Sequence, residues 1–186
     1  EDPAGSSRRQ DAARERAATD RLERVKRALE RAEGLVKEKA TRKEKRAVRV
    51  STTDPDARVM KMGDGGFRPA YNVQLSSDTG SQAVIGVVVS TAGNDQAELV
   101  PMVDQIEERY GTVPAQVLVD GGYNAHSNLD ALENRTTVFT PVPQPKDATV
   151  DPYKPKATDS PAVAGWRKRM GTARAKRIYK ERAATA

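Results

Sequence analysis

The chain has 186 residues, of which 37% are apolar, carries a net charge of +6, and contains no cysteine and a single histidine. The lack of cysteine excludes a disulfide framework and a thiolate zinc site, and one histidine excludes a multi-histidine metal cluster. A metal in this protein must therefore be held mainly by carboxylates, which favour a hard cation such as Mg²⁺.

The charge is unevenly distributed along the chain. Residues 1–50 carry 16 Lys and Arg against 10 Asp and Glu, residues 51–150 carry 6 against 13, and residues 151–186 carry 10 against 3. An acidic middle between two basic arms suits a metal site with phosphate-binding extensions, although solvated helix surfaces explain the basic arms equally well. No apolar run reaches the length of a membrane span and no signal peptide opens the chain, so we expect a cytoplasmic protein without a membrane partner.

Residues 1–46 are expected to form a basic, partly disordered lead that contains an amphipathic helix. Residues 1–18 show no hydrophobic periodicity, whereas apolar residues from Leu22 to Val36 recur at spacings of three and four. This spacing is typical of a helix with one apolar seam, which predicts docking on the rest of the domain or on a partner.

Residues 47–141 are expected to form the core. In chain order we expect a strand at 47–53, a hairpin of 71–76 and 83–89, a helix capped by Thr91–Asp95 that runs to about 110, a strand at 117–119, a helix at 124–134 and a strand at 137–141. Antiparallel strands followed by βαβ crossovers predict an α/β fold with a mixed sheet and helices packed on it.

Residues 142–160 are expected to be a proline-rich linker, and residues 161–186 two basic helices. Five of the eleven prolines lie between 141 and 160, which argues against a regular packed element there. Ser160-Pro161 is typical of a helix start, and Gly171 separates that helix from a second, strongly basic one.

Two aspartates follow apolar, β-branched segments: Asp54 comes after VRVSTT and Asp120 after VLV. Open α/β sheets bind ligands beyond the carboxyl ends of their strands, so both carboxylates are candidate metal ligands. Two carboxylates brought together there repel each other unless a divalent cation bridges them. Asp-Pro and Asp-Gly are also common turn dipeptides, so the residues alone support a metal site and ordinary turns about equally.

Three segments carry a resemblance to a known family: STTDPDARVMKMGDGGFRPAYNVQLSSDTGSQAVIGVVVS, LVDGGYN and DSPAVAGWRKRMGTARAKRIYKERAATA. Together they resemble bacterial insertion-sequence transposases of the DDE type, over residues 51–186 almost continuously. The resemblance implies an RNase H-like core in which Mg²⁺ (or Mn²⁺), held by two aspartates and a glutamate, promotes DNA strand cleavage and transfer. Asp54 and Asp120 match the two aspartates.

The resemblance also implies a third carboxylate, a Glu that follows a Tyr-x-x-Arg signature on a late helix. Tyr179 and Arg182 match the signature, but no Glu follows Arg182 before the chain ends. The first residue is Glu rather than Met. We therefore expect a fragment of a transposase whose triad is incomplete and which is inactive alone.

Asp78 is the rival for the first carboxylate, because it ends an alternating segment. Its setting, SSDTGS, is also that of an ordinary hairpin turn. For Tyr179 and Arg182 the resemblance implies contact with DNA close to the metals, and a surface Arg beside a half-buried Tyr is the structural alternative.

A basic stripe suited to a DNA backbone occupies the C-terminal helices, with Lys168, Arg174 and Arg177 as the proposed contacts and Arg167, Arg169 and Lys176 as its other members. Trp166 is interpreted as a core residue. The glycine motifs match no nucleotide-binding fingerprint, so no nucleotide cofactor is expected.

Two functions remain open from the sequence. The first is DNA transposition by Mg²⁺-dependent strand cleavage and transfer, with transposon ends and target DNA as partners and a homo-oligomer as the complete form. The alternative is a catalytically inactive fragment that binds DNA or assists assembly through its basic arms.

Overall fold

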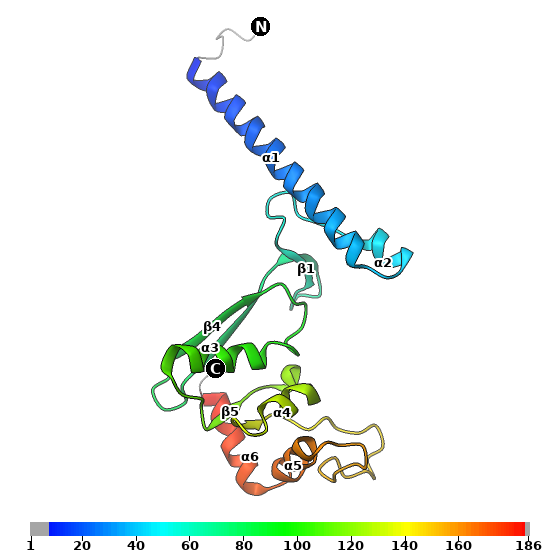
Figure 1. Ribbon diagram of the computed structural model, residues 1–186, viewed down its shortest axis with the longest axis vertical. Helices are drawn as coiled ribbons and strands as arrows, with labels where there is room; N and C mark the ends of the chain where they lie inside the picture. Colours follow the sequence, from blue (N-terminus) through cyan, green and yellow to red (C-terminus); the bar gives the residue numbers. More distant parts are fainter. Residues whose placement is uncertain (1–7, 185–186) are drawn as a thin grey trace. The chain divides into compact units, whose positions relative to one another are not determined.

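The computed structural model describes residues 8–184 and divides into two units (Figure 1). Among the described residues, the first unit comprises residues 8–71 and 91–93, and the second comprises residues 72–90 and 94–184. Among the described residues, no helix is both long and apolar enough to cross a membrane.

The first unit contains two helices and a small hairpin. Helix α1 spans Arg8–Glu38, α2 spans Arg42–Ala47, and strands β1 (Arg58–Lys61) and β2 (Phe67–Ala70) pair antiparallel. A capping box starts α2, because the Glu44 backbone N–H donates to Thr41 Oγ1 at 3.2 Å and the Thr41 N–H donates to the Glu44 carboxylate at 3.0 Å.

Helix α1 is longer than the apolar seam suggested. It already begins at Arg8, so residues 8–18 are helical, and residues 1–7 lie outside the described part. Ala, Arg and Glu are good helix formers, which favours a helix even where no apolar face exists. Leu22 and Leu29 of the seam remain exposed, whereas Ala28 and Leu35 are buried.

The strand expected at residues 47–53 is not present. Ala47 is the last residue of α2, and no strand begins before Arg58. The helix takes Ala47 because its capping box fixes the start six residues earlier, and Asp54-Pro55 starts a turn.

The second unit contains the mixed α/β elements predicted for the core. Strands β3 (Asn72–Ser77) and β4 (Val84–Ser90) form the expected antiparallel hairpin, with a register irregularity between Ser76 and Ser77. Strand β5 (Gln116–Leu118) pairs parallel with β6 (Thr137–Phe139). The two sheets are separate, so within the described residues each strand has a single hydrogen-bonded neighbour.

Helices pack around these strands. Helix α3 (Leu99–Tyr110) lies against β4, α4 (His126–Leu132) against α5 (Pro161–Met170), and α6 (Ala173–Lys180) ends in a short 3₁₀ turn, η2 (Glu181–Ala184). Their shared core is built from Leu99, Val103, Leu129, Leu132, Val138, Phe139, Val163, Trp166, Met170 and Ala175. Trp166 is fully buried, which confirms its assignment to the core.

Residues 142–160 contain no helix or strand, as the prolines predict, but they are tied to α5. Arg167 Nε donates to the Asp159 carboxylate at 2.8 Å, and both side chains are almost fully buried. The Arg167 guanidinium also donates to the Pro152 carbonyl at 3.1 Å. This segment is therefore anchored, and Arg167 is not available to the basic stripe.

Candidate metal and DNA site

Asp120 follows β5 and starts the 3₁₀ turn η1 (Gly121–Tyr123). Its carboxylate Oδ1 accepts the Gly122 backbone N–H at 2.8 Å, and its backbone carbonyl accepts the Thr140 hydroxyl at 2.8 Å. The Thr140 carbonyl in turn accepts the indole N–H of Trp166 at 3.0 Å. The core thus anchors the backbone of Asp120, while its carboxylate stays about half exposed.

Arg182 supplies a positive charge beside this carboxylate. Its Nη2 atom lies 3.4 Å from Asp120 Oδ2, and both side chains are partly exposed. Arg182 belongs to η2, which continues directly from α6. The packing of α6 therefore brings one half of the Tyr-x-x-Arg signature to the predicted metal ligand, whereas Tyr179 packs half-buried against the core.

A second carboxylate, Asp95, lies next to Asp120. Asn72 Nδ2 and Gln74 Nε2 both donate to Asp95 Oδ1, at 2.8 and 2.7 Å. Gln74 Nε2 also donates to Asn72 Oδ1 at 2.7 Å, and the Gln74 side chain is buried. The two amides on β3 therefore fix one oxygen of Asp95.

Gly122 lies close to both carboxylates. A Cβ atom at this position would be 3.0 Å from Asp120 Oδ1 and 3.1 Å from Asp95 Oδ2. Glycine thus keeps open a small space flanked by oxygen atoms of both carboxylates. Oxygen-only donors match the preference of Mg²⁺ or Mn²⁺, so these residues fit a hard divalent cation.

The carboxylates also raise the pKa of Tyr123. Burial, together with the negative charges of Asp95, Asp120 and Glu98, raises the pKa of Tyr123 to about 12, and Arg182 opposes this shift. The phenol is thus surrounded by acidic groups at the end of η1 and stays neutral under ordinary conditions.

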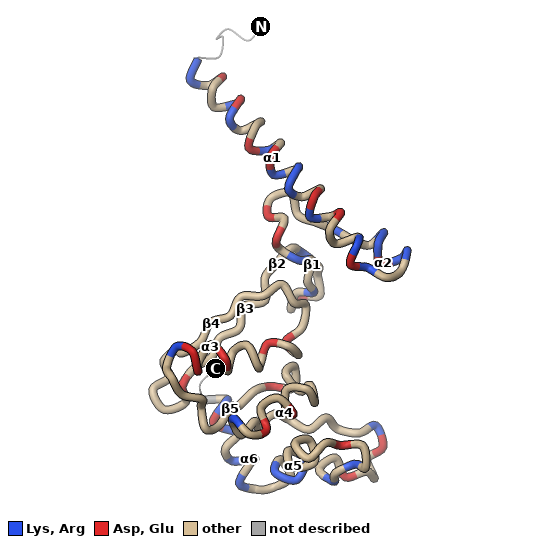
Figure 2. The backbone as a smooth tube through the Cα atoms, in the orientation of Figure 1, with Lys and Arg blue, Asp and Glu red and all other residues tan. Residues whose placement is uncertain are grey.

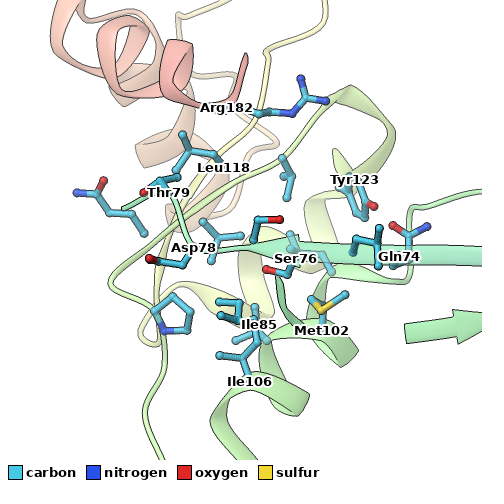
Figure 3. A pocket seen from close by; sticks show the side chains of 18 of the residues that line it. Gln74, Ser76, Asp78, Thr79, Ile85, Met102, Ile106, Leu118, Tyr123 and Arg182 are labelled. Atoms are coloured by element: carbon cyan, nitrogen blue, oxygen red, sulfur yellow. The ribbon is translucent and has the colours of Figure 1, made fainter. Parts of the chain in front are cut away.

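A cavity of about 350 Å³ adjoins these residues within the second unit (Figure 3). Met102 and Ile106 of α3 line it together with Ile85 of β4. One side is formed by residues 74–79 of β3 and the turn that follows, and another by β5 and Val119, which follows it. Asp120, Tyr123 and Arg182 also line it, so the candidate metal ligand Asp120 borders the cavity.

Asp54 belongs to the first unit. Its carboxylate accepts the Tyr71 hydroxyl at 2.9 Å and, within its own turn, the backbone N–H of Asp56 at 3.1 Å. The hydrogen bond to Asp54 raises the pKa of Tyr71. Asp54 therefore makes the contact of a turn residue with Asp56. Its hydrogen bond with Tyr71 is an additional long-range contact that a turn does not require.

Asp78 makes the contacts expected of a hairpin turn. Its Oδ2 accepts both the backbone N–H and the hydroxyl of Ser81, each at 2.7 Å, and its backbone pairs with Ala83 at 2.9 Å. The Ser81 hydrogen bonds lower the pKa of the Asp78 carboxyl. The contacts of Asp78, the rival of Asp54 for the first carboxylate, are thus explained by the hairpin turn.

The members of the basic stripe differ in exposure. Lys168, Arg174 and Arg177 are exposed, as DNA contacts must be. Arg169 is half-buried and donates to the Val138 carbonyl at 3.0 Å, and burial lowers the pKa of its guanidinium. Lys and Arg gather on α5 and α6, whereas on α1 they alternate with Asp and Glu (Figure 2).

Asp95 was not a candidate ligand from the sequence, where it is expected to be part of a helix cap. In the structure α3 has Glu98 at its N-cap with no side-chain cap, and Asp95 bonds to β3 instead. The usable signal was its position, since Asp95 follows the apolar β4 segment much as Asp120 follows β5. Among residues 8–184, no group of three or more His, Asp or Glu gathers in a metal-binding arrangement.

Comparison with known proteins gave one family. A family profile described as "Transposase DDE domain" matches residues 16–184. Neither the comparison with curated proteins nor that with solved structures gave a match.

Proposed function

The chain belongs to the transposase DDE domain family, and we propose that it carries the metal-dependent DNA cleavage and joining chemistry of a bacterial insertion sequence. One observation supports this most directly: Asp120 follows β5 beside the space at Gly122, with Arg182 Nη2 3.4 Å from its carboxylate. A carboxylate that holds a cation next to an arginine that binds phosphate suits phosphodiester chemistry.

In this proposal Asp120 and Asp54 hold the divalent ion, Mg²⁺ or Mn²⁺. When bound, the ion supplies charge stabilisation to the attacking oxygen, first water and then a 3′-OH, and to the leaving oxygen. Arg182 orients the DNA phosphate by charge-assisted hydrogen bonds. Asp78 is the weaker candidate for the first ligand, because Ser81 already occupies its Oδ2.

We further propose an RNase H-like arrangement for the catalytic form. Strands β3 and β5 each have one unpaired edge, and the cavity is lined by residues of both. An extended segment added there, parallel to β5, would join the two sheets and end at the same edge as Asp120.

The test of catalysis uses DNA that flanks the coding sequence in its source, carried on a supercoiled plasmid. Because no Glu follows Arg182 in this chain, the test uses the chain extended by a segment that carries the third carboxylate. With Mg²⁺ or Mn²⁺ we expect nicked or joined products from this extended chain, and none when it also carries Asp54→Ala or Asp120→Ala. Asp78→Ala is the matched control and should cleave normally. If Asp78→Ala is inactive and Asp54→Ala is active, the first ligand is Asp78. DNA binding without cleavage by the extended chain would instead support the non-catalytic alternative.

DNA binding is proposed to use Lys168, Arg174 and Arg177. Because each phosphate contact releases counterions, replacing Arg174 or Arg177 by Ala should weaken DNA binding and reduce the slope of log affinity against log salt by about 0.9. Arg135→Ala is the control, since Arg135 already pairs with Asp104 and Glu107 at 2.7 and 2.8 Å. Equal salt-dependence slopes for the wild type and all variants would exclude Arg174 and Arg177 as DNA contacts.

A homo-oligomer is proposed to form through α1. Leu22 and Leu29 lie seven residues apart on this helix and are 55% and 59% exposed, which suits a helix pair between copies. Sedimentation should show an oligomer that Leu22→Glu or Leu29→Glu dissociates. Unchanged sedimentation would exclude α1 as the contact.

A further inference from the structure

The two oxygens of Asp95 have different surroundings. Oδ1 accepts two amide N–H groups, from Asn72 and Gln74, which is a complete set of partners for one carboxylate oxygen. Oδ2 is the Asp95 oxygen nearest the space at Gly122: a Cβ built at Gly122 would lie 3.1 Å from it and 3.0 Å from Asp120 Oδ1. The amides therefore hold the carboxylate in an orientation that keeps Oδ2 beside Asp120.

A purely structural role of Asp95 would explain the hydrogen bonds to its Oδ1 but not the position of its Oδ2. A helix cap or turn would use the backbone N–H groups that follow, and Asp95 makes no such side-chain bond. A charged group that only joins β3 to its loop has no reason to approach a second carboxylate, because like charges at this range raise the free energy of the folded state. Within the described residues, the ion pairs involve other acidic groups, and none includes Asp95.

A divalent cation removes this electrostatic cost. We propose that Asp95, together with Asp120, holds the divalent ion of the active site, with Asn72 and Gln74 as positioning residues that orient its carboxylate and Gly122 as the residue that keeps the space open. The inference rests on the proposed function, since it adds a ligand to the same site. It goes beyond the three carboxylates that the family resemblance implies, none of which is Asp95.

The experiment measures Mn²⁺ binding to the full chain by the loss of the electron paramagnetic resonance signal of free Mn²⁺. Asp95→Asn keeps the size of the side chain and an oxygen for the two amide donors, so the fold should be retained. It places an NH₂ group in the position of Oδ2, and the dissociation constant for Mn²⁺ should rise about 10- to 100-fold, the range typical of groups that set metal affinity. Asp104→Asn, the same change on α3, should bind Mn²⁺ like the wild type.

Adjacent glycines provide a second, matched pair of variants. A Cβ at Gly122 falls within 3.1 Å of both carboxylates, whereas a Cβ at Gly121 meets nothing within 4 Å. Gly122→Ala should therefore weaken Mn²⁺ binding about tenfold or more, and Gly121→Ala should leave it unchanged. Replacement of Gln74 by Met, which removes one of the two amide donors, should give an intermediate loss.

The outcomes separate this inference from the proposed function. If Asp120→Asn loses Mn²⁺ affinity while Asp95→Asn and Gly122→Ala keep it, Asp95 is not a ligand and the proposed function stands. If the wild-type chain binds no Mn²⁺ and the extended chain that carries the third carboxylate cleaves no DNA, the proposed function fails and the inference fails with it. If a melting curve shows that Asp95→Asn is unfolded, Mn²⁺ binding by Gly122→Ala and Gly121→Ala decides the inference. Equal affinities of these two variants would overturn it.

Discussion

Arg182 and Asp120 lie 62 residues apart in the sequence, yet Arg182 Nη2 is 3.4 Å from Asp120 Oδ2. Asp120 is placed by β5 and by the hydrogen bond from Thr140, and Arg182 is placed by the packing of α6. The pair therefore couples the sheet to the C-terminal helices at the point where the metal ligand is proposed.

Arg182→Gln should change two affinities in opposite directions. The guanidinium repels a cation at Asp120, so its removal should strengthen Mn²⁺ binding, by up to about fivefold because exposed ion pairs are worth at most about 1 kcal/mol. The same change removes a phosphate donor and should weaken DNA binding. Mn²⁺ resonance and DNA titration measure the two effects. A parallel loss of both affinities would indicate that Arg182 only supports the fold.

Tyr123 reports on the charges around the site. Burial and the charges of Asp95, Asp120 and Glu98 raise its pKa to about 12, so removing a negative charge must lower the pKa towards its ordinary value of 10.0. We expect this shift in Asp95→Asn and in Asp120→Asn, measured by the ultraviolet absorption of tyrosinate. The control Asp104→Asn should leave the pKa of Tyr123 unchanged. If Asp95→Asn and Asp120→Asn also leave this pKa unchanged, the two carboxylates do not lie close to Tyr123.

Asp159 should make the second unit sensitive to acid. The Lys156 backbone N–H, at 2.8 Å, and the Arg167 guanidinium hold the pKa of the Asp159 carboxyl below its ordinary value of 3.8. The stability linked to this group is fully present above that ordinary value and is lost as the pH falls through the lowered one. Urea unfolding of the wild type and of Asp159→Asn should therefore differ most at neutral pH and converge in acid. A constant difference at every pH would contradict this assignment.

Two glycine substitutions should have opposite effects on stability. A Cβ at Gly86 would approach Met102 Sδ to 2.5 Å and Ile106 Cγ1 to 3.4 Å, so Gly86→Ala displaces the buried Met102 side chain and should cost about 1–3 kcal/mol. Gly165 lies within α5 with nothing within 4 Å of its Cβ position. Gly165→Ala should stabilise the protein by about 0.5–1 kcal/mol, because alanine favours a helix interior. Denaturant midpoints measure both, and a destabilised Gly165→Ala would contradict the open space seen there.

The elements that the sequence predicted well depend on local signals. The β3–β4 hairpin, α3, the β5 and β6 strands and α5 all have clear periodicity or explicit start and stop residues, and the structure confirms them. Asp120 was a candidate from its strand context alone, and Trp166 was correctly interpreted as core. These features follow from the spacing of apolar residues and from turn chemistry, which act over a few neighbouring residues.

Other features were decided only by tertiary packing. The segment 47–53 has β-branched residues but no strand partner in the structure, and a strand without a neighbour gains no ladder hydrogen bonds. Arg167 belonged to a predicted DNA-binding stripe, yet the fold buries it against Asp159.

The sequence by itself determined the family resemblance, the order of the second unit's elements and one proposed metal ligand, Asp120. Only the tertiary structure revealed Asp95, because its neighbours Asn72 and Gln74 are more than twenty residues away and its spatial relation to Asp120 runs through Gly122. Side-chain contacts of this range depend on how the strands and helices pack, and no spacing within one segment encodes them.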